Sequence, residues 1–232
     1  MSALSITWFG HATFVVTTPG GKRIVFDPWL TGNPKAPAGA KIDKADVICV
    51  THGHSDHTAD VVATARATGA PVLAMFELAN WFSAKGVKDV VGMGIGGTAT
   101  VKDLRISMTE AVHSSSIDDN GNFLYAGLAT GFVVRMEDNR SLYFAGDTAL
   151  FGDMRLIREL YSPEIAFLPI GDHYTMGPVG AAKACELLGV RQVVPMHYGT
   201  FPALTGTPDE LKRLVEPMGI DVLVLKPGET AQ

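Results

Sequence analysis

The stretch Thr51-His52-Gly53-His54-Ser55-Asp56-His57 decides the fold, because it places three histidines and an aspartate within seven residues. An apolar run over residues 47–50 precedes it and is typical of a buried strand. A predicted helix over residues 58–68 follows and ends at Gly69. The histidines therefore lie where a buried strand passes into a helix, which is where α/β folds place their sites.

The spacing inside this stretch indicates a metal site. Side chains two positions apart at the end of an extended strand point the same way, so His52 and His54 can hold one ion. Asp56 and His57 lie where the chain turns into the helix, and they can face a second ion. Gly53 allows the backbone to fold tightly around both ions.

Three more candidate ligands, His113, Asp147 and His197, each follow a predicted apolar strand. Two metal ions each need three or more protein ligands and an open position. Five imidazoles and two carboxylates meet that need if one carboxylate bridges the ions.

The rest of the sequence predicts a group of strands followed by α/β units, and this order occurs twice along the chain. No low-complexity linker divides it, so residues 1–232 are predicted to form a single α/β domain with two sheets and outer helices. Two glycine-containing segments are predicted as irregular: 91–97 as a flexible connection and 114–121 as a loop at the pocket entrance. The predicted strands are 4–9, 13–17, 23–27, 47–50, 71–75, 98–101, 105–110, 131–137, 141–145, 165–168, 192–195 and 221–225, and the predicted helices are 58–68, 77–85, 154–160, 179–188 and 209–216.

The composition excludes several classes of protein. The chain of 232 residues carries 19 basic and 24 acidic side chains, and its formal net charge of −5 with no basic block argues against nucleic-acid binding. No apolar run reaches the ~18 residues of a membrane span, and the first residues lack the pattern of a signal peptide. The two cysteines, Cys49 and Cys185, lie in apolar stretches. They favour reduced core thiols and a cytoplasmic location, although the sequence leaves a single bridge open.

The order of the candidate ligands resembles the metallo-β-lactamase superfamily, and the resemblance covers essentially the whole chain. It implies the metallo-β-lactamase fold, a four-layer αβ/βα sandwich. It also implies how the ligands divide between two ions: His52, His54 and His113 for the first, Asp56, His57 and His197 for the second, and Asp147 bridging both.

Flanking sequences narrow this resemblance to small metal-dependent hydrolases related to L-ascorbate-6-phosphate lactonase-like proteins. These sequences are Trp8-Phe9-Gly10-His11-Ala12, Asp27-Pro28-Trp29-Leu30-Thr31-Gly32-Asn33-Pro34, Phe144-Ala145-Gly146-Asp147-Thr148 and Pro195-Met196-His197-Tyr198-Gly199-Thr200-Phe201-Pro202.

Four other residues are candidates for positions beside the metal ions. The resemblance favours His11 at the rim of the active site, as a proton donor or substrate contact. His173 lies in a loop between a strand and a helix, where a substrate contact and a plain surface position are equally open. Asp27 ends a strand and is predicted to orient a ligand imidazole. Tyr198 follows His197 and can face the pocket or cover the core.

Metal-assisted hydrolysis is the leading hypothesis for function. A divalent ion lowers the pKa of its water to about 7 from ~15.7. The metal-bound hydroxide, oriented by Asp56, can then attack an ester, lactone or phosphoester, and no Gly-x-Ser-x-Gly elbow is present. Asp56, His11 and His173 are the candidate proton donors to the leaving group. The expected partner is a small-molecule substrate, and the oligomeric state is open, homo-oligomers included.

Two divalent ions are the expected cofactors. Zinc suits a histidine-rich tetrahedral site best, while manganese, nickel and iron also match a mixed nitrogen and oxygen ligand set. One alternative is an iron-dependent redox enzyme of the persulfide dioxygenase kind. The other is a non-catalytic metal-binding module. Such a module is expected to have lost one of the ligands, and this sequence contains every ligand of the pattern.

Overall fold

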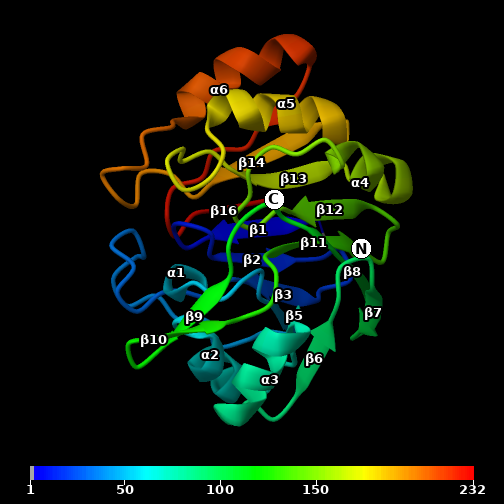
Figure 1. The fold of residues 1–232 in the computed structure, drawn as a ribbon. Helices are drawn as coiled ribbons and strands as arrows, with labels where there is room; N and C mark the ends of the chain where they lie inside the picture. Colours follow the sequence, from blue (N-terminus) through cyan, green and yellow to red (C-terminus); the bar gives the residue numbers. More distant parts are fainter. Residues whose placement is uncertain (1–2) are drawn as a thin grey trace.

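Two seven-stranded sheets pack face to face between two layers of helices, as seen in the computed structural model, which describes residues 3–232 (Figure 1). Met1 and Ser2 of the predicted domain lie outside the described residues. The predicted four-layer αβ/βα sandwich is confirmed. No helix among the described residues is long and apolar enough to cross a membrane.

The first sheet has the strand order β16-β1-β2-β3-β4-β5-β6 and carries the helices α1–α3. Its first strands pair antiparallel, and β3 to β6 run parallel. The elements are β1 (Ser5–Trp8), β2 (Phe14–Thr17), β3 (Arg23–Phe26), β4 (Val47–Cys49), α1 (Ser55–Thr58), α2 (Val61–Thr68), β5 (Val72–Met75), α3 (Phe76–Ala84), β6 (Val90–Met93) and β16 (Thr230–Ala231).

The second sheet has the order β15-β14-β13-β12-β11-β8-β7 and carries α4–α6 on its outer face. A separate two-stranded hairpin, β9–β10, follows β8. The elements are β7 (Thr98–Val101), β8 (Leu104–Glu110), β9 (Ser116–Asp119), β10 (Asn122–Tyr125), β11 (Thr130–Arg135), β12 (Ser141–Phe144), α4 (Met154–Tyr161), β13 (Ile165–Pro169), α5 (Pro178–Leu188), β14 (Gln192–Met196), α6 (Pro208–Val215), the 3₁₀ turn η1 (Glu216–Met218) and β15 (Asp221–Val222).

The apolar runs of the central strands follow from burial on both faces. In β3, Ile24 and Phe26 point into the core between the sheets, while Val25 points into the core under α2 and α3. The core between the sheets is rich in aromatic rings, and Phe26 of the first sheet stacks on Phe144 of the second with ring centroids 4.3 Å apart. This packing fixes how the strand ends of the two sheets lie relative to each other.

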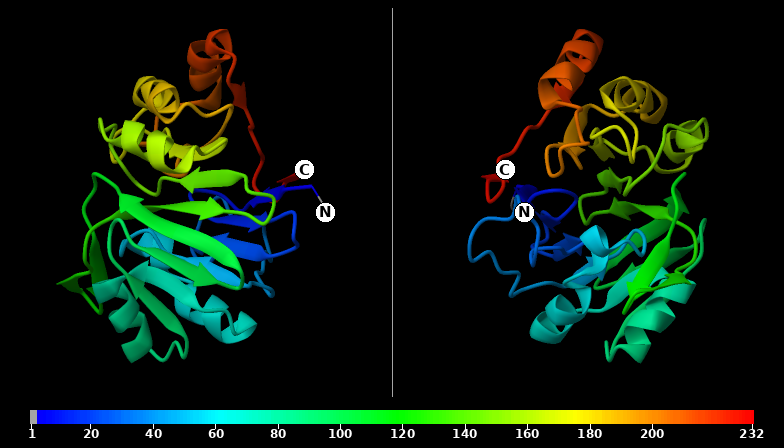
Figure 2. Two further views of the ribbon diagram at one scale, coloured as in Figure 1. Left: turned by 90° about the vertical axis from the view of Figure 1, so that its right-hand side faces the viewer. Right: turned by 60° about the vertical axis from the view of Figure 1, so that its left-hand side comes forward.

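The two ends of the chain are tied to one sheet edge. Strand β16 pairs antiparallel with β1, with Ile6 opposite Ala231. The views in Figure 2 show the two termini close together at this edge.

Three local predictions were wrong. The helix predicted over 58–68 begins only at Val61, after the separate helix α1, because the Asp60 N–H donates to the Pro28 carbonyl at 3.1 Å instead of to the preceding turn. The Asp60 carboxylate holds the same loop by accepting the N–H groups of Leu30 and Thr31. The predicted connection 91–97 contains most of β6, which pairs with β5. The predicted loop 114–121 contains β9, which is anchored by an ion pair between Asp119 and Lys85, 2.7 Å apart.

Both cysteine side chains are buried and unpaired. Cys49 belongs to the core between the sheets and Cys185 to the core under α4–α6. Their placement agrees with the prediction of core thiols.

Candidate metal centre

All seven candidate ligands converge from strand ends of both sheets. In the first sheet, the segment after β4 supplies His52, His54, Asp56 and His57. In the second sheet, the segments after β8, β12 and β14 supply the others. The structure brings together all seven residues of the predicted set: His52, His54, Asp56, His57, His113, Asp147 and His197.

The first group of possible ligands is His52, His54 and His113, whose ring nitrogens lie within 4.8 Å of one another. His52 Nε2 and His54 Nδ1 are 3.0 Å apart and point toward the same space. His52 is fully buried, and His54 and His113 are half-buried at the base of a cleft. Burial lowers the pKa values of all three rings, which favours the neutral imidazole that binds metal.

The second group contains Asp56, His57 and His197, as predicted, and also His11. The candidate ligand atoms of these four residues lie within 4.8 Å of one another. Asp56 is the most exposed of the four, at 24%. The structure thus places one more nitrogen near the second ion position than the predicted set contains.

Asp147 lies between the two groups. Its Oδ2 atom is 2.9 Å from His197 Nε2 and 3.5 Å from His57 Nε2. The same atom is 3.7 Å from His113 Nε2 and 4.0 Å from His52 Nε2. Despite burial, which raises the pKa of a carboxyl group, the nearby His197 and His57 rings hold the pKa of Asp147 well below its ordinary value. A carboxylate in this position can contact ions in both groups.

Buried polar atoms without partners show that the cluster fits a metal. His57 Nε2, Asp147 Oδ1 and both ring nitrogens of His197 are buried and make no hydrogen bond of acceptable geometry among the described residues, although both Nε2 atoms lie close to Asp147 Oδ2. Leaving such an atom unpaired costs about 1–3 kcal/mol. Divalent ions bound by one nitrogen of each ring and by the Asp147 carboxylate would satisfy three of these four atoms, and the donor set suits zinc.

A buried pair of residues, Asp27 and Thr51, orients two of these rings. The Thr51 N–H and hydroxyl donate to Asp27 at 2.8 and 2.7 Å, and His57 Nδ1 lies 2.8 Å from the same carboxylate. Because the Thr51 hydroxyl has given its only proton to Asp27, its oxygen accepts from His52 Nδ1 at 3.0 Å. The hydrogen-bond network therefore assigns both rings the tautomer with a free Nε2.

The charges around His57 and Asp27 are coupled. Burial disfavours a charged His57, but the carboxylates of Asp147, Asp27 and Asp56 raise its pKa well above the ordinary value. Burial raises the pKa of Asp27. A bound divalent ion would displace the extra proton from His57, since only the neutral ring is a ligand.

His11 is fully buried beneath the cleft, whereas the sequence placed it at the rim. Its Nε2 contacts Asp56 Oδ2 at 3.1 Å, its Nδ1 contacts Thr200 Oγ1 at 2.9 Å, and its ring lies 3.9 Å from that of His197. The chain turns back sharply here, with φ of +99° at Gly10 and +55° at His11. Burial, together with the nearby His197, lowers the pKa of His11 to about 4, so its ring is neutral at pH 7.

Two other predicted residues lie away from the ligand groups. His173 is exposed, and its ring packs edge-on against Tyr174 at 4.4 Å. Tyr198 stacks on Trp8 at 5.2 Å, within the core between the sheets. It is Tyr174, rather than either of them, that lines the cleft.

The cleft over the ligands has a volume of about 470 Å³. Ser114 lines it, at the start of the segment predicted to lie at the pocket entrance, whereas sequence reasoning missed the aromatic side chains of Trp29, Phe201 and Tyr174 in its walls. One signal was available: Trp29 lies two residues after Asp27, and Phe201 four residues after His197.

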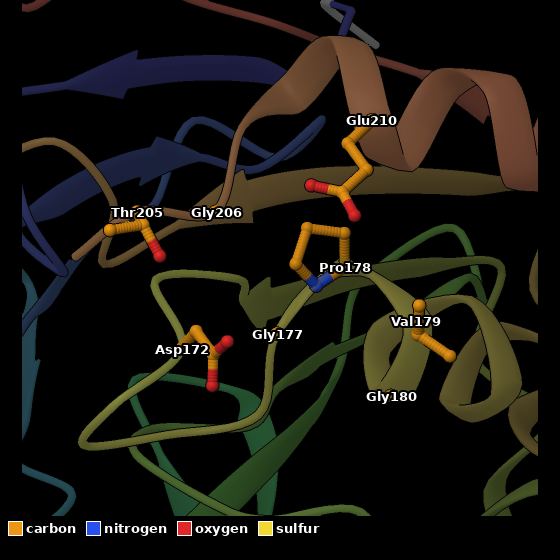
Figure 3. Close-up of a pocket in the computed structure, with 8 residues that line it drawn as sticks. All are labelled: Asp172, Gly177, Pro178, Val179, Gly180, Thr205, Gly206 and Glu210. Atoms are coloured by element: carbon orange, nitrogen blue, oxygen red, sulfur yellow. The ribbon is translucent and has the colours of Figure 1, made fainter.

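A second cavity lies where α5 and α6 begin, and Figure 3 shows its lining. The Asp172 and Glu210 carboxylates face it from opposite sides, next to Pro178. Its lining among the described residues contains neither histidine nor cysteine, so it lacks the mixed donor set of the histidine cluster.

Comparisons with known proteins agree with this geometry. A family model described as Beta-lactamase superfamily domain matches residues 22–198. The chain is 49% identical to a UPF0173 metal-dependent hydrolase of Solibacter usitatus, over 99% of this chain and 100% of that protein. It is 46% identical to one of Methanopyrus kandleri, over 98% and 99% of the two chains.

Among solved structures, Igni18, described as a novel metallo hydrolase from the hyperthermophilic archaeon Ignicoccus hospitalis, superposes with a TM-score of 0.87. Its sequence identity is 39%, and the match covers 98% of this chain and 97% of that chain. An isothiocyanate hydrolase from Delia radicum gut bacteria shares the fold at a TM-score of 0.74 and 24% identity, with 98% of both chains covered.

Proposed function

The chain belongs to the metallo-β-lactamase superfamily, and we propose from that premise that it is a metal-dependent hydrolase of an ester, lactone or phosphoester that uses two divalent ions. His52, His54 and His113 would hold one ion, and Asp56, His57 and His197 the other. Asp147 would bridge them. Zinc is the proposed ion, and the donor set also accepts manganese, nickel or iron.

The observation that carries this proposal is the set of unpaired buried atoms on His57, Asp147 and His197. The Nε2 atoms of His57 and His197 face the Asp147 carboxylate at 3.5 and 2.9 Å without the geometry of a hydrogen bond. When bound there, divalent ions activate water and offset the negative charge that develops in hydrolysis.

The protein's own residues orient the reacting groups. Asp56 lies at the base of the cleft and accepts a hydrogen bond from His11 Nε2. Since His11 is neutral, its remaining nitrogen Nδ1 accepts from the Thr200 hydroxyl. We infer that Thr200 and His11 hold Asp56 in one rotamer, and that Asp56 in turn orients the attacking water. His11 is thus a positioning residue in this proposal.

His173 and Tyr198 take lesser parts. His173 supports Tyr174 at the mouth of the cleft through its ring contact and lies outside the proton path. Tyr198 packs under Trp8 and supports the segment that carries His197.

Elemental analysis of protein purified without chelators tests the metal site. We expect about two zinc or manganese ions per chain, and Asp147→Ala should lower both metal content and the hydrolysis of an ester, lactone and phosphodiester panel. Asp43→Ala is the matched control, because Asp43 is exposed and belongs neither to the cleft lining nor to a ligand group. Two ions and full turnover in Asp147→Ala would refute the bridging role. A single iron with oxygen consumption would instead favour the redox alternative.

The proposed location is the cytoplasm, and the proposed partner is a small-molecule substrate. The buried, unpaired state of Cys49 and Cys185 supports a reducing compartment.

A further inference from the structure

The cleft has one aromatic wall. Trp29 and Phe201 form it, with ring centroids 6.0 Å apart and planes inclined by 31°. Both rings meet His11 edge-on, at 5.2 and 5.7 Å, so the wall reaches down to the ligand groups. Tyr174, which is 55% exposed, stands at the mouth. An apolar surface therefore leads from solvent to the candidate metal positions.

The cleft lining contains no lysine or arginine among the described residues. Its only formal charges are the carboxylates of Asp56 and Asp147, both in the candidate ligand set. A phosphate or carboxylate on a substrate is ordinarily held by a guanidinium or ammonium group. Here the side chains outside the ligand set are aromatic rings and the two hydroxyls of Ser55 and Ser114. The walls thus offer apolar contact and neutral hydrogen bonds, and no cation for an anionic group.

We propose that the substrate is an uncharged carboxylic ester or lactone with an apolar arm that packs against Trp29 and Phe201. This inference rests on the proposed hydrolase function and narrows it: the bound ions themselves would be the only cations for a phosphoester, and the side chains of the cleft favour an uncharged substrate. In the reaction, the oxygen of water bonds to the acyl carbon, the acyl C–O bond breaks, and the leaving oxygen takes a proton. The volume of about 470 Å³ suits a small molecule whose arm lies along the aromatic wall.

A pair of lactones tests the apolar arm directly. γ-Butyrolactone and γ-nonalactone share the reacting ring and differ by a pentyl chain. We expect kcat/KM of the zinc- or manganese-loaded protein to be at least about tenfold higher for γ-nonalactone. Turnover of p-nitrophenyl phosphate should be lower than that of either lactone, because no side chain of the wall binds its charge.

Phe201→Ala should reduce the ratio of the two kcat/KM values several-fold, since it removes half of the wall. Phe201→Leu serves if the alanine variant does not fold, and it should reduce the ratio less. The matched control is Phe123→Ala, because Phe123 is 77% exposed on the β9–β10 hairpin and does not line the cleft. This control should leave the ratio unchanged. Ser114→Lys adds a cation to the lining and should raise p-nitrophenyl phosphate turnover relative to that of γ-nonalactone.

A binding measurement separates this inference from the hydrolase proposal. Ligand-observed NMR with the uncharged amide N-benzylacetamide should show binding that is weakened in Phe201→Ala and kept in Phe123→Ala. If the protein binds the amide in this way but hydrolyses nothing, the hydrolase proposal fails and the ligand class stands. If it hydrolyses both lactones equally well, the hydrolase proposal stands and the apolar arm is refuted. If it hydrolyses p-nitrophenyl phosphate as efficiently as γ-nonalactone, the hydrolase proposal stands and the preference for an uncharged substrate is refuted.

Discussion

Replacing Asp27 with Asn should remove metal from both positions without touching a ligand. The two side chains have the same shape, but Asn offers an NH₂ group where Asp27 Oδ2 accepts from Thr51 Oγ1 and His57 Nδ1. The Thr51 hydroxyl must then accept from Asn and donate to His52 Nδ1. Both rings lose the proton on Nδ1 and carry it on Nε2, where it blocks metal binding.

The size of the effect follows from these contacts. Loss of a residue that orients a metal ligand typically costs 10–100-fold in metal affinity. The opposite orientation of the Asn amide would set its NH₂ against the Thr51 N–H, which donates to Oδ1 at 2.8 Å. An unpaired buried donor costs about 1–3 kcal/mol, so either orientation has a penalty. We therefore expect the free energy of unfolding to fall by about 1–3 kcal/mol in the variant.

Competition with a chromophoric chelator measures the affinity, and elemental analysis measures the metal content. Asp43→Asn is the matched control on an exposed position. Wild-type affinity for both ions in Asp27→Asn, in a protein that has folded, would show that the Asp27–Thr51 pair does not set the tautomers.

Three further predictions follow from the same geometry. His11→Ala should keep the metal content but lower kcat, because Asp56 loses its orienting partner. The same variant should lose less stability in acid when the protein is metal-free. The pKa of His11 is about 4 in the folded state and 6.5 ordinarily, so in the wild type this residue lowers the free energy of unfolding as pH falls from about 6.5 to about 4. Urea unfolding at pH 7 and pH 5 measures this. Gly171→Ala should lower stability by about 1–3 kcal/mol, since its new methyl would collide with the His197 carbonyl, whereas Gly94→Ala meets nothing within 4 Å. Chelation should lower the thermal midpoint of the wild type, which calorimetry would detect, and an unchanged midpoint would contradict the fit of metal to the unpaired atoms.

The sequence predicts most of the fold because buried strands leave apolar runs that are easy to recognise. Such runs end just before His113, Asp147 and His197, and the structure places all three at the same cleft. Strand ends position side chains through a rigid sheet, so their neighbourhood follows from topology. The candidate ligands could be predicted for this reason.

The position of His11 could not be predicted, because it depends on contacts far along the chain. The His197 N–H donates to the His11 carbonyl at 3.1 Å, and the two rings lie 3.9 Å apart at an angle of 43°, although 186 residues separate them. The aromatic wall could not be predicted for the same reason. Trp29 and Phe201 lie in loops that are far apart in the sequence, and no local pattern specifies the paths of these loops. The break at Asp60 is a third case, in which a carboxylate binds a neighbouring loop rather than its own helix.

The candidate ligands divide between the two halves of the sandwich, and this division links metal binding to the fold. His57 comes from the first sheet, whereas Asp147 and His197 come from the second. These are the residues whose buried atoms lack protein partners. Ions that satisfy them would join the two sheets at one edge, in addition to the aromatic core that joins them through Phe26 and Phe144. Metal binding should therefore stabilise the packing of the two sheets against each other. In that case, metal should slow amide exchange in β3, β4, β12 and β14 together. If metal ordered only the loops that carry the ligands, exchange in these strands would not change.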